Sequence, residues 1–554
     1  MKIFNNFLLI VTARKREIVF AMIMPILFVA FSLLLRDYFM PYWSGNYSDP
    51  EYAYLLNSLN ILKFKSPIHV DHPGTTLQLL GAIVIQVTFI IRSFLSNHYQ
   101  SYTVVESVLK NPEFYLTVIN NAILLASFLA IFLLGLVSFA LTKNRIISLM
   151  LQINPFLWTI LIESSRVRPE SLLIPLTQAF VIVLLFYLYH KVENSTQFAL
   201  SLGIILGLGI VTKVTFLPFM LSVFVLRKLR LQILVVLSTL VTFFLFTTPV
   251  ITQYHRIFGW LISIATHTGR YGSGEKGFIN FSDLPNTFKS LFEQDRLFFT
   301  VVFTAFIFSI LMTVYKLFLQ KHHYQWHEEL NNLLNDKFYC ILICLLGINF
   351  IQIAMTIKHP AIHYLLPSMG LCSLLIIIIG DLLYKELSNT LNSNLLHKIS
   401  LFFFVAGLVV FVNSLYQNLL ITQKIHMNYK DEIQAIHQLI DRNYKNIPHV
   451  RYYRCSDREY ALKFGNDFAG SQFSNELQSI YPDGLFYNVW SKKYETFSAE
   501  VNIDDYKDKS KIIFHGTPFD TKYDSYEKYL PDFDLQKIYE GKYEALYLAS
   551  SKPK

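Results

Sequence analysis

The feature that most limits the fold is a series of apolar runs, most of them close to the length of a membrane span. A helix needs roughly 20 apolar residues to cross about 30 Å of hydrocarbon, and it satisfies its own backbone hydrogen bonds there. Only 16% of the residues are charged, whereas soluble domains have roughly 25%. The sequence therefore predicts a polytopic α-helical membrane protein. We expect eleven spans, at residues 18–35, 114–140, 147–162, 171–190, 198–212, 214–226, 232–251, 297–318, 338–357, 364–384 and 399–421.

Short basic clusters between these runs indicate how the chain is oriented. Cytoplasmic loops of membrane proteins are enriched in Lys and Arg. With eleven spans and a cytoplasmic N-terminus, every cluster falls on the cytoplasmic side; the clusters lie at 14–16, 143–145, 191, 227–230, 316–323 and 385–398. This arrangement explains the net charge of +9 without nucleic-acid binding. We expect a multi-pass protein of the inner or plasma membrane, in contact with membrane lipids.

A further apolar run at 76–95 is assigned from the number of spans, because one added span moves every later loop to the other side of the membrane. Counting it as a twelfth span would invert all the later basic clusters. It also contains Arg92, and an arginine at the centre of a bilayer costs roughly 2.5–3.5 kcal/mol. We therefore interpret this run as a membrane-skirting or re-entrant helix on the outer face.

The same topology divides the chain into domains. Residues 1–17 form a cytoplasmic lead-in, because their basic residues follow the apolar stretch instead of preceding it as in a cleaved signal. Residues 18–421 form a transmembrane domain with a long first outer loop at 36–113 and a second large outer loop at 252–296. Residues 422–554 lie outside, on the periplasmic side of an inner membrane.

The composition of this C-terminal part predicts a small soluble α/β domain. It is rich in Tyr, Asp, Lys and Asn, and strand-like stretches at 450–453, 512–514 and 545–548 accompany helical periodicity at 432–443. The four cysteines of the chain have no disulfide or C-x-x-C spacing. His359 and His363 are spaced as a pair that could bind a metal, but the proline between them argues against the helical spacing that such a pair needs, so the sequence indicates no metal site.

Acidic residues begin the first outer loop. Asp49, Pro50 and Glu51 open an amphipathic stretch, and Pro50 suits the first position of a helix with Asp49 as its cap. A cap on a surface helix is one interpretation. The other is a carboxylate at the membrane edge that accepts a proton from an acceptor group, as a general base does.

Cations gather in two short outer segments. The turn at 163–170 contains Arg166, Arg168 and Glu170, and a guanidinium matches the oxygens of a phosphate. Lys213 stands at the outer junction of two short predicted helices. Snorkelling toward the interface, together with mutual ion pairing of the arginines and glutamates in the turn, explains these side chains equally well.

Two further outer segments carry candidate anion-binding groups. The loop 267–277 combines His267 and Arg270 with four glycines in nine residues, so its backbone amides are free to approach an anion. A flexible surface loop explains it as well. The edge at 358–367 carries Lys358, His359, His363 and Tyr364.

In this order, the motifs resemble the GT-C glycosyltransferases, in the protein O-mannosyltransferase-like branch that includes the lipid A aminoarabinose transferase. The resemblance covers about residues 18–421. The matching stretches are Asp49-Pro50-Glu51-Tyr52, His72-Pro73-Gly74-Thr75, Val167-Arg168-Pro169-Glu170, Val211-Thr212-Lys213-Val214-Thr215 and His363-Tyr364-Leu365-Leu366-Pro367.

The resemblance implies an inverting transfer of a sugar from a polyprenyl-phosphate carrier to a lipid, glycan or protein acceptor at the non-cytoplasmic face. It makes Asp49 the general base, with Glu51 beside it, and places Arg168, Lys213 and His363 near the phosphate. Members of the family differ in their use of a divalent cation, so the resemblance leaves such a cofactor open.

The sequence departs from the family pattern at three positions. Pro50 separates the two acidic residues that are adjacent in the family, Gly74 replaces a second proline, and His363 stands where the family has Arg.

Two other classes of function remain as alternatives: a transporter or flippase of lipid-linked sugars, and a non-catalytic scaffold. Transporters place polar sites near the bilayer midplane, often in paired repeats, whereas the polar segments here cluster on one face.

Overall fold

The computed structural model describes residues 15–44, 49–71, 73–95, 101–190, 195–268, 274–277, 283–319, 333–388, 393–452, 455–489, 491–506, 511–516 and 533–551. This part of the chain divides into two compact units. The first unit comprises Met1–Leu33, Val70–Leu77 and Asn121–Asn418, and the second comprises Leu34–His69, Gln78–Asn120 and Leu419–Lys554.

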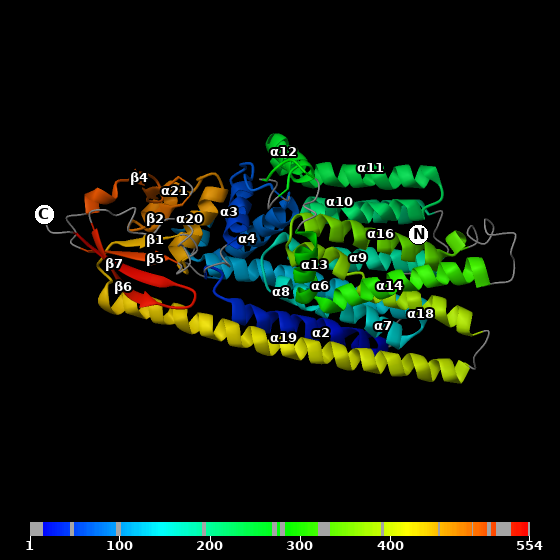
Figure 1. Ribbon diagram of the computed structural model, residues 1–554. Helices are drawn as coiled ribbons and strands as arrows, with labels where there is room; N and C mark the ends of the chain where they lie inside the picture. Colours follow the sequence, from blue (N-terminus) through cyan, green and yellow to red (C-terminus); the bar gives the residue numbers. More distant parts are fainter. Residues whose placement is uncertain are drawn as a thin grey trace. The chain divides into compact units, whose positions relative to one another are not determined.

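Long apolar helices make up most of the described chain (Figure 1). Eight of them are long and apolar enough to cross a membrane, or up to ten helical spans if each of two bent pairs counts as one. The eight are α2 (Lys15–Phe39), α4 (Thr75–Leu95), α6 (Pro112–Thr142), α9 (Pro169–Tyr189), α11 (Leu229–Phe246), α14 (Arg296–Val314), α16 (Lys337–Lys358) and α19 (Ser393–Asn443). The predicted polytopic helical architecture is confirmed. The run at 76–95 is helical as expected, and by length and apolarity it meets the same criterion as the spans.

Two predicted spans are broken rather than continuous. The run 147–162 forms α7 (Arg145–Ile153), η3 (Asn154–Phe156) and α8 (Trp158–Ser164), with a bend of 65°. The chain leaves the helical conformation at Leu157, whose ψ is 138°, and Pro155 lies in the short η3 turn just before it, where it removes one backbone donor.

The second broken span is the run 364–384. It forms η8 (Ile362–Leu365), α17 (Leu366–Met369) and α18 (Cys372–Leu387), bent by 42°. At the break, a Cβ on Gly370 would lie 2.4 Å from the Thr177 Cγ2 atom. Only glycine therefore allows the chain to pass α9 at this point.

Short elements pack closely in the first unit. Helix α10 (Thr196–Thr212) lies against α11, where a Cβ on Gly203 would come within 2.6 Å of the Val235 carbonyl oxygen (Figure 1). Small residues let membrane helices approach in this way. The predicted span 214–226 is a 3-10 helix, η4 (Val214–Val225), with Pro218 inside it. The first unit also contains η5 (Thr248–Gln253), α12 (Tyr254–Thr266) and α13 (Leu284–Gln294).

The second unit is built on a seven-stranded sheet in the order β4-β3-β2-β1-β5-β7-β6 (Figure 1). Strand β1 is parallel to β2 and β5, and the remaining pairs are antiparallel. The strands are β1 (His449–Arg451), β2 (Leu485–Asn488), β3 (Lys493–Glu495), β4 (Glu500–Val501), β5 (Lys511–Gly516), β6 (Phe533–Glu540) and β7 (Ala545–Ser551). The expected C-terminal α/β architecture is thereby confirmed.

Helices cover this sheet and extend the second unit. The end of α19 packs through Ile436 on Ile513 and Leu546. Helices α3 (Glu51–Leu62), α5 (Val104–Lys110), α20 (Arg458–Phe468) and α21 (Ser474–Ile480) also belong to this unit, as does most of α4. Helix α3 lies directly on α20, where a Cβ on Gly465 would be 2.7 Å from the Tyr52 carbonyl oxygen.

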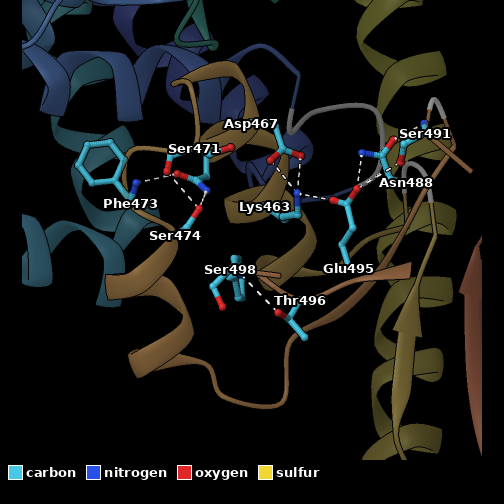
Figure 2. Close-up of polar contacts among 12 residues, drawn as sticks. Lys463, Asp467, Ser471, Phe473, Ser474, Asn488, Ser491, Glu495, Thr496 and Ser498 are labelled. Atoms are coloured by element: carbon cyan, nitrogen blue, oxygen red, sulfur yellow. Dashed lines mark hydrogen bonds and ion pairs between the residues drawn. The ribbon is translucent and has the colours of Figure 1, made fainter. Parts of the chain in front are cut away.

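A buried lysine connects α20 to the sheet, as Figure 2 shows. The Lys463 ammonium group lies 2.7 Å from Asp467 Oδ1 and 2.9 Å from Glu495 Oε2. A buried cation is costly unless it is paired and hydrogen-bonded, and these two carboxylates supply both. The Phe473 amide donates to Asn466 Oδ1 over 2.9 Å and fixes the turn after α20.

Candidate functional site

The centre of the candidate site is an ion pair in the first unit. Lys213 is the C-terminal cap of α10, and Glu170 lies in the first turn of α9. Both residues are 3% exposed, and the Lys213 ammonium group donates to Glu170 Oε1. Each charge also has the sign that its helix end favours, since helix dipoles attract cations at the C-terminus and anions at the N-terminus. The pair therefore stabilises the junction of two helices.

Part of the first-loop motif lies beside this lysine. Pro73 forms an antiparallel bridge with Lys213, and the Thr76 and Thr212 hydroxyl groups are 2.7 Å apart. Gly74 has a φ of 69°, a left-handed conformation that proline, fixed near −65°, does not adopt. The departure from the family pattern at Gly74 thus has a conformational reason. His72, which precedes Pro73, lies outside the described residues.

The stretch around His363 approaches the same pair. His363 Nε2 lies 3.6 Å from Glu170 Oε1, and the Lys213 ammonium group sits 4.6 Å from the centre of the Tyr364 ring. A cation over an aromatic face is attracted to it. The Gln352 side chain donates to the backbone carbonyl of Tyr364 over 2.7 Å, and in the same way to that of Thr215. This buried amide fixes the two segments that flank the ion pair.

The arginine-containing turn completes the cluster. The Arg168 guanidinium lies 3.6 Å from Glu163, and Arg166 is buried at 3% exposure. The Ser171 hydroxyl donates to the backbone carbonyls of Glu163 and Arg166 over 2.6 and 2.8 Å, which holds the turn closed.

The charges of this group do not balance. Three cations, Arg166, Arg168 and Lys213, stand against two carboxylates, Glu163 and Glu170. The Arg168 and His363 side chains are 17% and 27% exposed, whereas the Lys213 and Glu170 side chains are each 4% exposed. The cluster therefore combines several cations with a partly open edge, both of which favour an anionic ligand.

Other predicted residues lie on neighbouring segments of the first unit. The Lys358 ammonium group donates to the Ala265 carbonyl over 2.7 Å, and His359 Nε2 lies 3.4 Å from the Ile264 carbonyl oxygen. Both therefore contact the end of α12, where His267 bridges Lys276. The described residues contain no group of three or more His, Cys, Asp or Glu side chains placed to hold a metal. Arg270 lies outside the described residues.

The acidic pair of the first loop belongs to the second unit. Glu51 is the first residue of α3 and Pro50 is its N-cap, without a side-chain cap hydrogen bond. The prediction that Asp49 caps the helix and Pro50 occupies its first position is therefore wrong by one residue. Asp49 is exposed and Glu51 is fully buried, at 0% exposure. Of the two carboxylates, Asp49 is thus the one that can meet a ligand from solution.

Sequence reasoning missed two residues that organise the cluster. Glu163, the partner of Arg168, was visible in the turn but was not assigned a role. Gln352 is 1% exposed and lies inside an apolar run. A lone amide within a predicted span was the signal, because polar side chains in membrane helices almost always face a partner.

Together, these observations define a polytopic α-helical membrane protein with a largely buried polar cluster that contains several cations. No protein-family model matches the sequence, and a search of curated proteins finds no relative. Among solved structures, the chain is similar to the crystal structure of ArnT from Cupriavidus metallidurans bound to undecaprenyl phosphate. The TM-score is 0.46 at 10% sequence identity, over 94% of this chain and 97% of that chain.

Proposed function

We propose that the protein is a membrane glycosyltransferase that moves a sugar from a polyprenyl-phosphate-linked donor to an acceptor at the non-cytoplasmic face. The observation that carries this proposal is the buried Lys213–Glu170 pair with His363 beside it. Three of the sequence stretches that resemble family motifs supply these residues and Arg168, and Pro73 of a fourth bridges Lys213. Residues from four distant parts of the sequence, matched only by order, thus meet in one cluster.

The cluster has the chemistry that binding the phosphate of the donor requires. As the sugar leaves, negative charge grows on the phosphate, and fixed cations stabilise that charge most in the transition state. Arg168 and His363 form the more open edge, so we assign them the direct contacts with the phosphate. Lys213 and Glu170 lie deeper. We assign them the role of positioning the side chains of Arg168 and His363 and of contributing to the electrostatic potential at the phosphate.

Asp49 supplies the base in this mechanism. An exposed carboxylate accepts the proton of the acceptor hydroxyl or amine as that group attacks the anomeric carbon. The bond from the sugar to the phosphate breaks on the opposite side, so the configuration inverts. The phosphate departs on its lipid, and the proton remains on the carboxylate until solvent removes it.

One structural feature favours the transporter alternative. Two helix pairs are bent, by 65° and 42°, and the second of these pairs carries His363. Broken helices form substrate sites in many transporters. The two functions differ in outcome, because a transporter delivers the lipid-linked sugar intact whereas a transferase releases polyprenyl phosphate.

Mass spectrometry of envelope glycans and carrier lipids, with and without the protein, tests the proposal. We expect one polyprenyl-phosphate sugar to accumulate in cells that lack the protein and one envelope glycan to lose that sugar. A strain with Asp49→Asn should show the same change. Unchanged glycans together with unchanged carrier lipids would contradict the transferase assignment. A non-catalytic scaffold predicts, in addition, that Arg168→Ala has no effect on either.

A further inference from the structure

A cavity of about 870 Å³ lies within the second unit, among the segment that follows α2, the end of α19 and the beginning of α20. Its lining includes two aromatic residues, Trp43 and Tyr481. The side chains of Gln434, Asp441 and Arg458 line it as well. Aromatic faces and polar side chains thus line one cavity.

The wall of this cavity is fixed from behind by a buried network. The Asp457 carboxylate accepts from the backbone amides of Glu459 and Tyr460, over 2.8 and 3.1 Å, and from Arg451 Nε over 2.6 Å. Arg451 also pairs with Glu459 over 3.0 Å. These bonds occupy the two carboxylates and hold the start of α20, so that Arg458 projects from a rigid segment.

The aromatic side is fixed in the same way. The His437 Nε2 donates to the Ser456 carbonyl over 2.7 Å, and the Trp43 ring lies edge-on to His437 with 5.2 Å between centroids. The Tyr481 hydroxyl donates to the Leu109 carbonyl over 3.0 Å. A preorganised wall loses less side-chain entropy when a ligand binds.

The charges of the cavity select among ligand classes. Its lining has four carboxylates, from Asp37, Asp441, Asp457 and Glu459, against Lys430 and Arg458, and counting Arg451 behind the wall still leaves the carboxylates in excess by four to three. This balance disfavours a phosphate or another strong anion. Sugars present an apolar C–H face and a rim of hydroxyl groups that both donate and accept, which suits an aromatic wall with a guanidinium, an amide and a carboxylate around it.

We propose that this cavity binds a neutral or amino-bearing saccharide, with its ring against Trp43 and its hydroxyl groups on Arg458, Gln434 and Asp441. The assignment of this saccharide as part of the acceptor rests on the proposed glycosyltransferase function; the binding itself does not. The acceptor class then narrows from lipid, glycan or protein to a molecule that carries a sugar.

Saturation-transfer NMR and calorimetry on the full chain in nanodiscs test the proposal. The probes are maltose, lactose, N,N′-diacetylchitobiose, its deacetylated form and, as an anion, inorganic phosphate. We expect at least one saccharide to bind and phosphate not to compete. Trp43→Ala and Arg458→Ala should each weaken binding by about tenfold or more, since each removes a principal contact.

Matched controls make the result specific to the cavity. Arg442→Ala and Asp431→Asn change exposed residues of α19 outside the cavity lining and should leave saccharide affinity unchanged. Lys213→Met should abolish transfer without altering saccharide binding, which separates the two proposals. The assignment is overturned if no saccharide binds, if phosphate displaces the saccharide, or if the Trp43 and Arg458 variants bind as tightly as the unmodified chain.

Discussion

Lys213 and Glu170 form an ion pair that is almost fully withdrawn from solvent, at the meeting point of the end of α10 and the start of α9. Removing one member of a buried pair leaves an uncompensated charge, which costs about 3–5 kcal/mol. Lys213 is therefore both half of a structural link and a cation of the proposed phosphate site. Its two roles can be separated by experiment.

The first prediction concerns this separation. Lys213→Met should lower the thermal unfolding temperature of the purified protein and reduce sugar transfer by about 100-fold or more, because the transition-state charge loses a cation. The double variant Lys213→Met with Glu170→Gln should recover much of the stability, since no buried charge is left unpaired, but it should not recover transfer. Full activity in either variant would remove Lys213 from the site.

The second prediction concerns the histidine that stands where the family has arginine. His363→Arg should retain or increase transfer, because a guanidinium binds phosphate oxygens in a two-pronged manner. His363→Ala should lower transfer by about tenfold, the effect of one lost hydrogen bond to a charged group. His255→Ala, at an exposed position of α12, is the control and should have no effect. Equal rates for the arginine and alanine variants would contradict a phosphate contact.

The third prediction tests the backbone beside Lys213. Gly74→Ala should destabilise the protein by about 1–2 kcal/mol, because its φ of 69° disfavours any residue with a Cβ. Gly74→Pro, which restores the family residue, should be worse because proline does not reach this φ. Gly259→Ala is the matched control, since a Cβ there meets nothing within 4 Å. Unfolding temperatures of the three variants provide the measurement, and an unchanged Gly74→Pro variant would contradict the assignment.

The fourth prediction concerns how the stability of the fold depends on pH through His449, whose backbone carbonyl accepts a hydrogen bond from Arg451 of the network behind the saccharide cavity. Burial, followed by the charges of Arg451 and His515, lowers the pKa of His449 well below its usual 6.5. The folded protein therefore keeps this imidazole neutral while the unfolded chain protonates it. Stability is complete above about pH 6.5 and declines as the pH falls below that value.

The corresponding measurement is the unfolding temperature between pH 8 and pH 5. His449→Gln should flatten the decline, because the substituted side chain takes up no proton in either state. The exposed His255→Ala variant should retain the full pH dependence. A decline of equal size in the His449→Gln variant would show that other groups are responsible.

Sequence periodicity predicted the helices well because membrane spans are long and nearly uncharged, as in α6 and α16. It placed β1, β5 and β7 because their cores are apolar, with Ile513 and Leu546 fully buried. It did not predict β2, β3, β4 or β6: β4 is only two residues long, and β3 and β6 contain charged residues that resemble a loop. Pro155 is a local signal for the first break, whereas the break at Gly370 depends on its contact with α9, which no local pattern reveals.

The candidate site was predicted in part. Charged residues at the ends of apolar runs are costly, so Arg168, Glu170 and Lys213 stood out in the sequence. The tertiary fold decides which of these residues pair. It also places Glu163 and Gln352 where they hold them. The saccharide cavity was not foreseen, because its lining comes from segments as distant as Trp43 and Tyr481. The role of Asp49 stays a prediction.

The most direct test of the central claim follows a labelled polyprenyl-phosphate sugar in vesicles that contain the purified full chain and an acceptor. The account predicts that the label moves to the acceptor, that an equal amount of free polyprenyl phosphate appears, and that Asp49→Asn stops both. Translocation of the intact lipid-linked sugar across the bilayer, without release of polyprenyl phosphate, would contradict it.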